Sequence, residues 1–262
     1  LLWITLVSIA VLTHFYLFSM IVLLWVCDLM NHRFIRKDIN NKNVLQELSL
    51  SMLCILFFAW QAGYFAITAS LNNDRGYGFY GMNILGLFDA QGWSYILKSP
   101  TNPSSWGEGF AYLGLGAILA GIAALVTLLI PPSQNKDLLK SFLKRHRPLG
   151  LLLIFLTIFA ISNHIGFGDL NFTYPLPAWA LKIFDTLRSS ARLFWPVHYL
   201  LLIAFFVAIT KCYPKKVAFL ILGACFLIQA ADTSKGWISN RKQLSERHYL
   251  EKHNHQLSNI FW

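Results

Sequence analysis

Long apolar runs, separated by short clusters of Lys, Arg, Asn, Pro and Gly, are the most regular pattern along this chain. A membrane-spanning helix needs about 20 apolar residues to cross roughly 30 Å of hydrocarbon. By this measure the pattern predicts six spans, at residues 1–27, 49–71, 109–130, 149–166, 194–211 and 216–231. The runs are too long for the strands of a membrane barrel, and helices satisfy their own backbone hydrogen bonds in lipid. The expected fold class is an all-α polytopic membrane protein with about six transmembrane helices and long outward-facing loops.

The distribution of charge supports this interpretation and adds an orientation. Only 13% of the 262 residues are charged, whereas about 25% is usual in a soluble domain. More than half of the 22 Lys and Arg residues lie in three short segments, 28–48, 131–148 and 211–216. Because short cytoplasmic loops are enriched in Lys and Arg, these three segments are predicted to be cytoplasmic. The net charge of +10 therefore needs no nucleic-acid partner, and the lipid bilayer is the expected surrounding.

The remaining segments are predicted to face outward, and two of them are long. Residues 72–108 are rich in Gly and aromatic residues, and residues 167–193 include a predicted helical stretch at 178–192. Connections of this length usually have a function of their own. The segment 232–262 is amphipathic and is interpreted as an outward-facing extension, the possible start of a periplasmic domain.

Arg188 and Arg192 are the clearest candidates for ligand binding. On a helix they lie one turn apart and share a face. Two guanidinium groups at a membrane surface are suited to bidentate binding of a phosphate or pyrophosphate. The alternative is that they anchor the protein to lipid headgroups.

Four further residues carry ionisable groups in or near predicted spans. Glu108 opens the third span between glycines, as a weak candidate for a base or simply as a helix N-terminal charge. His164 and His198 are predicted near the outer surface, where a histidine is either a proton-transfer group or a packing residue. His14 is predicted nearer the middle of the first span, where an ionisable residue calls for a functional hypothesis.

Several common chemistries have no support in the sequence. Gly76-Tyr77-Gly78 does not open a nucleotide-binding βαβ unit, and no Walker A, His-Glu-x-x-His or Gly-x-Ser-x-Gly motif is present. The four cysteines lie in or beside apolar runs without zinc-ligand spacing. No cofactor is evident, and a divalent metal is left open without support.

Three stretches carry a resemblance to a known family: Gly-Tyr-Gly-Phe-Tyr-Gly-Met-Asn-Ile-Leu at 76–85, Glu-Gly-Phe-Ala-Tyr-Leu-Gly-Leu-Gly at 108–116 and Leu-Arg-Ser-Ser-Ala-Arg-Leu-Phe-Trp-Pro at 187–196. They resemble a family of bacterial polytopic membrane proteins grouped with the C-type glycosyltransferases. In the third stretch the family more typically has Gly where this chain has Ala191.

The resemblance implies transfer of a sugar from a polyprenyl-phosphate donor to an envelope glycan or lipid, on the outer face of the bacterial inner membrane. It implies that Arg188 and Arg192 bind the donor phosphate, and that Glu108, Tyr112, His164 and His198 line the substrate site. The catalytic acid of such enzymes usually lies in the first outward loop. The chain is accordingly expected to be a C-terminal portion of a longer protein, with the base upstream of Leu1.

Two alternatives to an enzyme remain. A transporter or lipid flippase is expected to place broken helices and polar groups near the membrane midplane. A non-catalytic scaffold of envelope-polysaccharide assembly would need no catalytic acid at all. An acidic residue in a first outward loop upstream of this chain would favour the enzyme over the scaffold.

Overall fold

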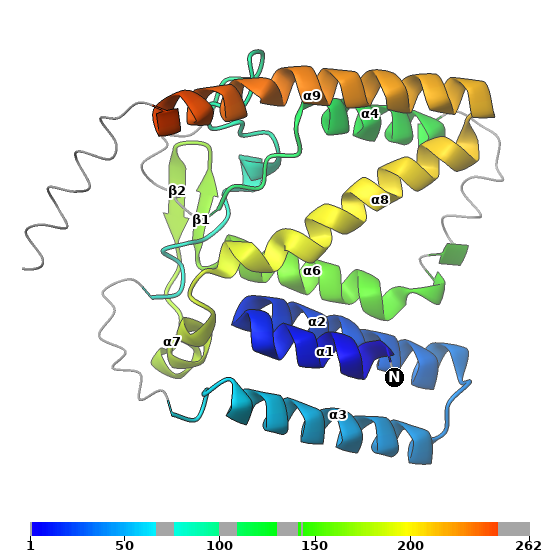
Figure 1. The fold of residues 1–262 in the computed structure, drawn as a ribbon, viewed down its shortest axis with the longest axis vertical. Helices are drawn as coiled ribbons and strands as arrows, with labels where there is room; N and C mark the ends of the chain where they lie inside the picture. Colours follow the sequence, from blue (N-terminus) through cyan, green and yellow to red (C-terminus); the bar gives the residue numbers. More distant parts are fainter. Residues whose placement is uncertain (1, 67–75, 100–108, 130–140, 143, 246–262) are drawn as a thin grey trace, which may run out of the picture.

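The first third of the chain forms three helices that lie against one another (Figure 1). The computed structural model describes residues 2–66, 76–99, 109–129, 141–142 and 144–245. Helix α1 (Leu2–Thr13) is followed directly by α2 (Phe15–Met30), which continues into a π-helical turn, η1 (Asn31–Arg36), and then α3 (Asn41–Gln61) follows. The side chain of Asn40 caps α3 by accepting a hydrogen bond from the backbone N–H of Asn43, at 2.9 Å.

The rest of the described chain contributes four longer helices and a small β-hairpin. A 3₁₀ turn, η2 (Ile84–Leu87), precedes α4 (Leu115–Leu129) and α6 (Arg147–Ile161). The hairpin pairs β1 (His164–Phe167) with β2 (Leu170–Thr173) antiparallel, with His164 opposite Thr173. The chain then forms α7 (Ala178–Phe184), the 3₁₀ turns η4 (Asp185–Leu187) and η5 (Ser190–Phe194), and helices α8 (Trp195–Cys212) and α9 (Lys215–Ser245).

The predicted set of six spans is wrong in number and in several boundaries. Within the described residues, four helices are long and apolar enough to cross a membrane: Phe15–Arg36, Asn41–Gln61, Ser190–Cys212 and Lys215–Arg241. Three others are apolar but shorter, namely Leu2–Thr13, Leu115–Thr127 and Arg147–Ile161. The protein is thus mostly helical, as expected, and four of its described helices are long and apolar enough to span a membrane. A count of apolar residues, however, does not separate helix from apolar turn, strand or loop.

The first predicted span shows how this error arises. Residues 1–27 are not one helix, because the chain reverses at His14, whose backbone is extended and whose Nδ1 accepts a hydrogen bond from the Tyr16 N–H at 3.2 Å. His14 therefore caps the start of α2 at a turn, and the prediction that it lies near mid-span is wrong. Similarly, the fourth run, 149–166, ends as a helix at Ile161 and supplies the first residues of β1.

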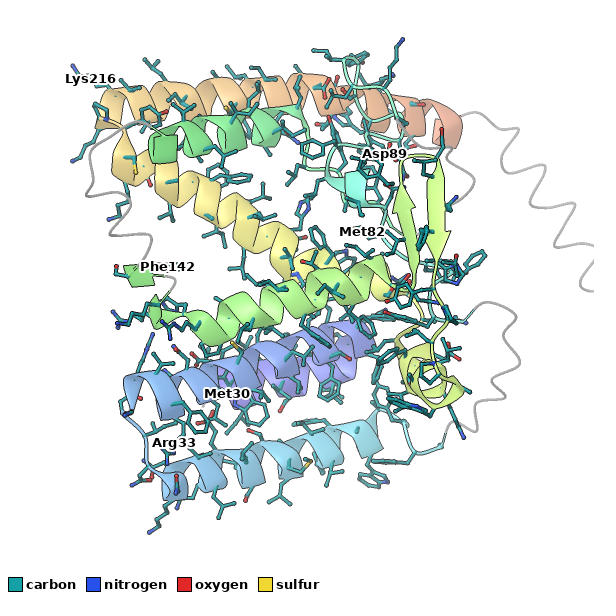
Figure 2. All side chains as sticks on the ribbon, turned by 180° about the vertical axis from the view of Figure 1, so that it is seen from behind. Met30, Arg33, Met82, Asp89, Phe142 and Lys216 are labelled. Atoms are coloured by element: carbon teal, nitrogen blue, oxygen red, sulfur yellow. The ribbon has the colours of Figure 1, made fainter. Side chains whose placement is uncertain are left out.

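The helices share two ends, and these differ in character (Figures 1 and 2). Figure 2 shows Arg33, Phe142 and Lys216 at one end and Met82 and Asp89 at the other. We call the first the basic end, because the described residues of the three segments predicted to be cytoplasmic lie there. We call the second the loop end; it holds residues 76–99, 109–114 and 162–194. The gathering of the basic segments at one end is the arrangement that alternating spans require.

Small residues allow α4 to lie very close to α9. Gly116, Ala120 and Ala124 recur every four residues along α4, and the two alanines pack in one buried cluster with Ile209 of α8 and Ala218 of α9. A side chain at Gly116 would meet the backbone carbonyl of Cys225. Helices in membranes associate through such close backbone approach. The second buried cluster joins α2, α6 and η5 through Met20, Leu156 and Leu193, among others, next to the loop end.

Candidate functional site

Three sequence stretches that are far apart in the chain meet at the loop end. The Met82 N–H donates to the carbonyl of Ala160 at 2.7 Å, and the Ala191 N–H donates to the carbonyl of Tyr80 at 3.1 Å. The loop of residues 76–83 is thereby fixed between the end of α6 and η5. The Gly- and aromatic-rich stretch and the Arg-Ser-Ser-Ala-Arg stretch, which the sequence singled out separately, are therefore parts of one site.

Gly78 is the point of closest approach in this site. Its φ is +98°, and a Cβ there would lie 2.6 Å from Asn163 Oδ1 and would overlap the ring of His164. Ser162, directly before Asn163 in the chain, has φ +67° and ψ −169°, a region of backbone space that is nearly restricted to glycine. The buried segment after α6 is thus held in a strained conformation, and strain of this kind concentrates at functional sites.

His164 lies at the outer edge of this contact. Its side chain is exposed, and its Nδ1 lies 3.2 Å from Thr173 Oγ1 across the hairpin. The hairpin itself is anchored by Asn83, whose amide donates to the carbonyl of Gly168 at 2.9 Å and accepts from its N–H at 3.2 Å. His164 is consequently positioned at the surface of the loop end.

Arg192 is held against the first turn of α2. Its guanidinium carbon lies 5.2 Å from the centre of the Tyr16 ring, a cation–π contact. The hydroxyl of Tyr16 in turn accepts a hydrogen bond from the Ser189 N–H at 2.8 Å. Tyr16 was not singled out from the sequence, since a tyrosine in an apolar run gives no signal of its own.

Arg188 is exposed, and its relation to Arg192 differs from the prediction. The stretch 178–192 is not a continuous α-helix: α7 ends at Phe184, and Ser189 has the non-helical angles φ −83° and ψ 62° between two 3₁₀ turns. The premise that the two arginines share a helix face was therefore wrong. Both remain at the loop end, in the six residues that precede Phe194 and the start of α8.

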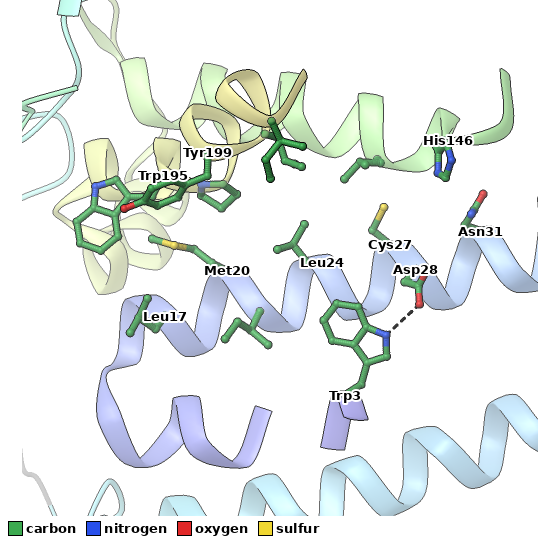
Figure 3. Close-up of a pocket in the computed structure, with 15 residues that line it drawn as sticks. Trp3, Leu17, Met20, Leu24, Cys27, Asp28, Asn31, His146, Trp195 and Tyr199 are labelled. Carbon is green, nitrogen blue, oxygen red and sulfur yellow. Dashed lines mark hydrogen bonds between the residues drawn. The ribbon is translucent and has the colours of Figure 1, made fainter. Parts of the chain in front are cut away.

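An apolar groove runs from the start of α8, where Trp195 follows Arg192 by three residues, toward the basic end (Figure 3). It lies between α2 and α8, has a volume of about 460 Å³ and is lined mainly by apolar side chains. At the loop end its walls are Leu17 and Met20 of α2 and Trp195 and Tyr199 of α8. At the far end they include Asp28, Asn31 and His146. From Leu17 to Asn31 the wall of α2 is about 21 Å long, at 1.5 Å per helical residue.

Tyr112, predicted to line a substrate site, is instead bonded to α9. Its hydroxyl donates to Asp232 Oδ2 at 3.2 Å, and Asp232 Oδ1 also accepts from Ser94 Oγ at 2.8 Å and from the Tyr95 N–H at 3.0 Å. Burial raises the pKa of the Tyr112 phenol, and the neighbouring Asp232 charge acts in the same direction. Tyr112 therefore stays a hydrogen-bond donor at neutral pH. Its observed contacts tie the loop-end segments to α9.

The other predicted residues occupy separate positions. His198, in the second turn of α8, is half-buried and hydrogen-bonded to the backbone of Ala111, next to Tyr112. Glu108 lies outside the described residues. Asp232 was predicted from the sequence to be an outward-facing acid at the start of the 232–262 segment, whereas here it lies within α9, which runs without a break to Ser245. Within the described part of the chain, no three His, Cys, Asp or Glu side chains are placed to hold a metal ion.

Comparison with known proteins gives a family but no activity. No curated protein and no solved structure matches the chain. One family model does match, over residues 1–234, and it is described as a domain of unknown function, DUF6311. The match covers most of the 262 residues, including both arginines, the hairpin and the Tyr112–Asp232 contact. The chain is therefore a member of the DUF6311 family.

Proposed function

We propose that this chain is the lipid-phosphate-binding part of a membrane glycosyltransferase. In this proposal it transfers a sugar from a polyprenyl-phosphate donor to an envelope glycan or lipid. The basic end faces the cytoplasm and the loop end faces outward from a bacterial inner membrane, in keeping with the positive-inside bias. The proposal assigns the donor phosphate to Arg192 and Arg188, and it assigns no catalytic base among the described residues.

The observation that supports the proposal best is the position of Arg192. The ring of Tyr16 fixes its guanidinium at the end of the helices, three residues before the exposed Trp195. A prenyl phosphate needs a cation for its phosphate and an apolar surface directly beside it. A guanidinium binds phosphate through paired N–H donors, and it can stack on an aromatic ring while doing so. In a transfer reaction, negative charge develops on the leaving phosphate, so a preorganised cation there also lowers the barrier.

The strained segment at Ser162–His164 fits the same function. It brings an exposed imidazole to the surface of the loop end, on the same side of the molecule as the two arginines. The acceptor of the sugar must approach from this side if the phosphate lies at Arg192. His164 is therefore proposed as a contact for the sugar or its acceptor.

The test is sugar transfer from radiolabelled polyprenyl-phosphate donors in membranes that contain the full-length protein. Loss of a hydrogen bond to a charged group costs about 1.5–3 kcal/mol, which corresponds to roughly a 10-fold to 150-fold loss of kcat/KM. Arg192→Ala is expected to show a loss in this range, and Arg192→Lys an intermediate loss, because lysine keeps the charge without the planar stacking group.

Lys182→Ala provides the control, since Lys182 is an exposed cation on the neighbouring helix α7. It is expected to leave transfer unchanged. If substitution of Arg188 and Arg192 leaves sugar transfer unchanged, and the variants are inserted and folded, the proposed phosphate site is refuted. If no sugar is transferred from any of the donors in the presence of a competent acceptor extract, the proposed glycosyltransferase activity is refuted and a scaffold is favoured.

A further inference from the structure

The far end of the α2–α8 groove is polar, unlike the rest of its length (Figure 3). It is lined near the basic end by Asp28 of α2, by Asn31 at the start of η1, and by His146, which directly precedes α6. The rest of the lining is almost entirely apolar, from Leu17 and Met20 to Leu200 and Ile203. The groove thus has the shape and composition of a site for an amphiphile whose polar group lies at the basic end.

Asn31 supplies the strongest indication that a ligand belongs there. The residue is only 4% exposed, and its Oδ1 accepts no hydrogen bond from any described residue. A buried acceptor without a donor is unfavourable, so such an atom calls for a donor from outside the protein. Asn31 is also the first residue of the π-helical turn η1, and π-helical turns are frequent at functional sites.

Asp28 adds negative charge to the same corner of the groove. Its Oδ2 accepts a hydrogen bond from Trp3 Nε1 at 2.9 Å, and its Oδ1 lies 3.8 Å from His32 Nε2. The indole fixes the carboxylate at the groove (Figure 3). These two residues, one of them charged, line a cavity whose other walls are almost entirely apolar. This combination is complementary to a group that carries both positive charge and N–H donors.

We infer that the groove binds a phospholipid with a primary ammonium headgroup, such as phosphatidylethanolamine. The ammonium donates to Asp28 and to Asn31 Oδ1, and one acyl chain lies between α2 and α8. The phosphate lies near Arg145 and Arg147, which flank His146 in the sequence and are both exposed at the basic end. The inference concerns the end of the groove opposite Arg192 and does not depend on the proposed function.

The chemistry separates this lipid from other occupants. A small cation would leave the apolar walls unused. An anionic lipid such as phosphatidylglycerol has no ammonium group and meets the negative charge of Asp28. Phosphatidylcholine keeps the positive charge, but three methyl groups replace its N–H donors, so it cannot donate to Asn31.

The experiment measures lipid binding by native mass spectrometry on the full chain in detergent. Phosphatidylethanolamine, phosphatidylcholine and phosphatidylglycerol with identical acyl chains serve as probes. We expect phosphatidylethanolamine to bind at least about 10-fold more tightly than the other two, as loss of hydrogen bonds to a charged group predicts. Asn31→Leu and Asp28→Asn are each expected to abolish this preference, whereas Asp38→Asn, at an exposed carboxylate of the same end, is expected to keep it.

A second variant addresses the acyl chain and covers the case in which the polar variants do not fold. Leu24→Trp, one helical turn before Asp28 on α2, fills the middle of the groove, and it is expected to weaken binding of phosphatidylethanolamine by a similar factor. Equal binding of the three lipids, tighter binding of phosphatidylglycerol, or unchanged binding in Leu24→Trp would overturn the inference. Sugar transfer is not measured here, so this outcome is independent of the test of the glycosyltransferase.

Discussion

Replacing Asp232 by Leu is expected to detach the loop-end segments from α9. The carboxylate is 4% exposed and accepts hydrogen bonds from the hydroxyls of Ser94 and Tyr112 and from the Tyr95 N–H. Ser94 and Tyr112 are 1% and 8% exposed, so their hydroxyls would lose their acceptor in a buried setting. Each unsatisfied buried group costs about 1–3 kcal/mol, which gives about 2–6 kcal/mol for the two hydroxyls.

Asp232→Asn is the graded comparison. The amide keeps one oxygen for Ser94 and Tyr95, and its NH₂ group can donate to the Tyr112 hydroxyl, which then acts as an acceptor. The expected cost is therefore only about 1 kcal/mol, the usual net value of one hydrogen bond. Ser239→Leu, at an exposed position of the same helix, controls for the addition of a leucine to α9.

The assay is thermal unfolding of the detergent-purified protein, together with limited proteolysis of residues 76–99. We expect apparent melting temperatures in the order wild type and Ser239→Leu, then Asp232→Asn, then Asp232→Leu. Protease cleavage should increase first within 76–99. A double-mutant cycle with Ser94→Ala should show a smaller effect of Asp232→Leu when Ser94 is already absent. Strict additivity, or an Asp232→Leu protein as stable as wild type, would refute the hydrogen-bonded contact.

Two further predictions concern the ends of the molecule. Gly78→Ala is expected to lower the melting temperature clearly more than Gly92→Ala. Both glycines have positive φ, but a Cβ at Gly78 would meet Asn163, whereas a Cβ at Gly92 would have open space. Equal melting temperatures of the two variants would contradict the packing described. At the basic end, the hydrogen bond with His32 is the main cause that lowers the pKa of Asp38. The pair therefore contributes to stability above the pKa that Asp38 has in the unfolded state, and this contribution is lost as the pH falls through the lower pKa of Asp38 in the folded state. Carboxyl NMR titration should give a lower midpoint for Asp38 in the wild type than in His32→Gln, and identical midpoints would exclude the cause named here.

The sequence alone determined the class of protein, because hydrophobicity is a property of residues and not of their contacts. Long apolar runs and three basic segments predicted a helical membrane protein whose basic connections lie at one end. The structure has four helices long and apolar enough to span a membrane, and the described residues of the basic segments lie at one end. The residues 76–85 and 187–196 were also recognised as separate stretches. What periodicity could not show was that they touch, since the hydrogen bonds from Ala191 to Tyr80 and from Met82 to Ala160 join residues far apart in the chain.

The tertiary structure decided where the helices end and what the polar residues do. His14 ends a helix by capping the next one, and the apolar residues after Ile161 form a strand because Ser162 turns the chain there. Arg188 and Arg192 do not share an α-helix, since Ser189 interrupts it, and Arg192 acquires its place from Tyr16 at the other end of the sequence. Asp232 and Asn31 look ordinary in the sequence. Yet Asp232 accepts hydrogen bonds from two hydroxyls, and Asn31 lines a groove with a buried Oδ1 that accepts no hydrogen bond from a described residue. These properties depend on desolvation and on distances between remote residues, and only the folded chain sets either of them.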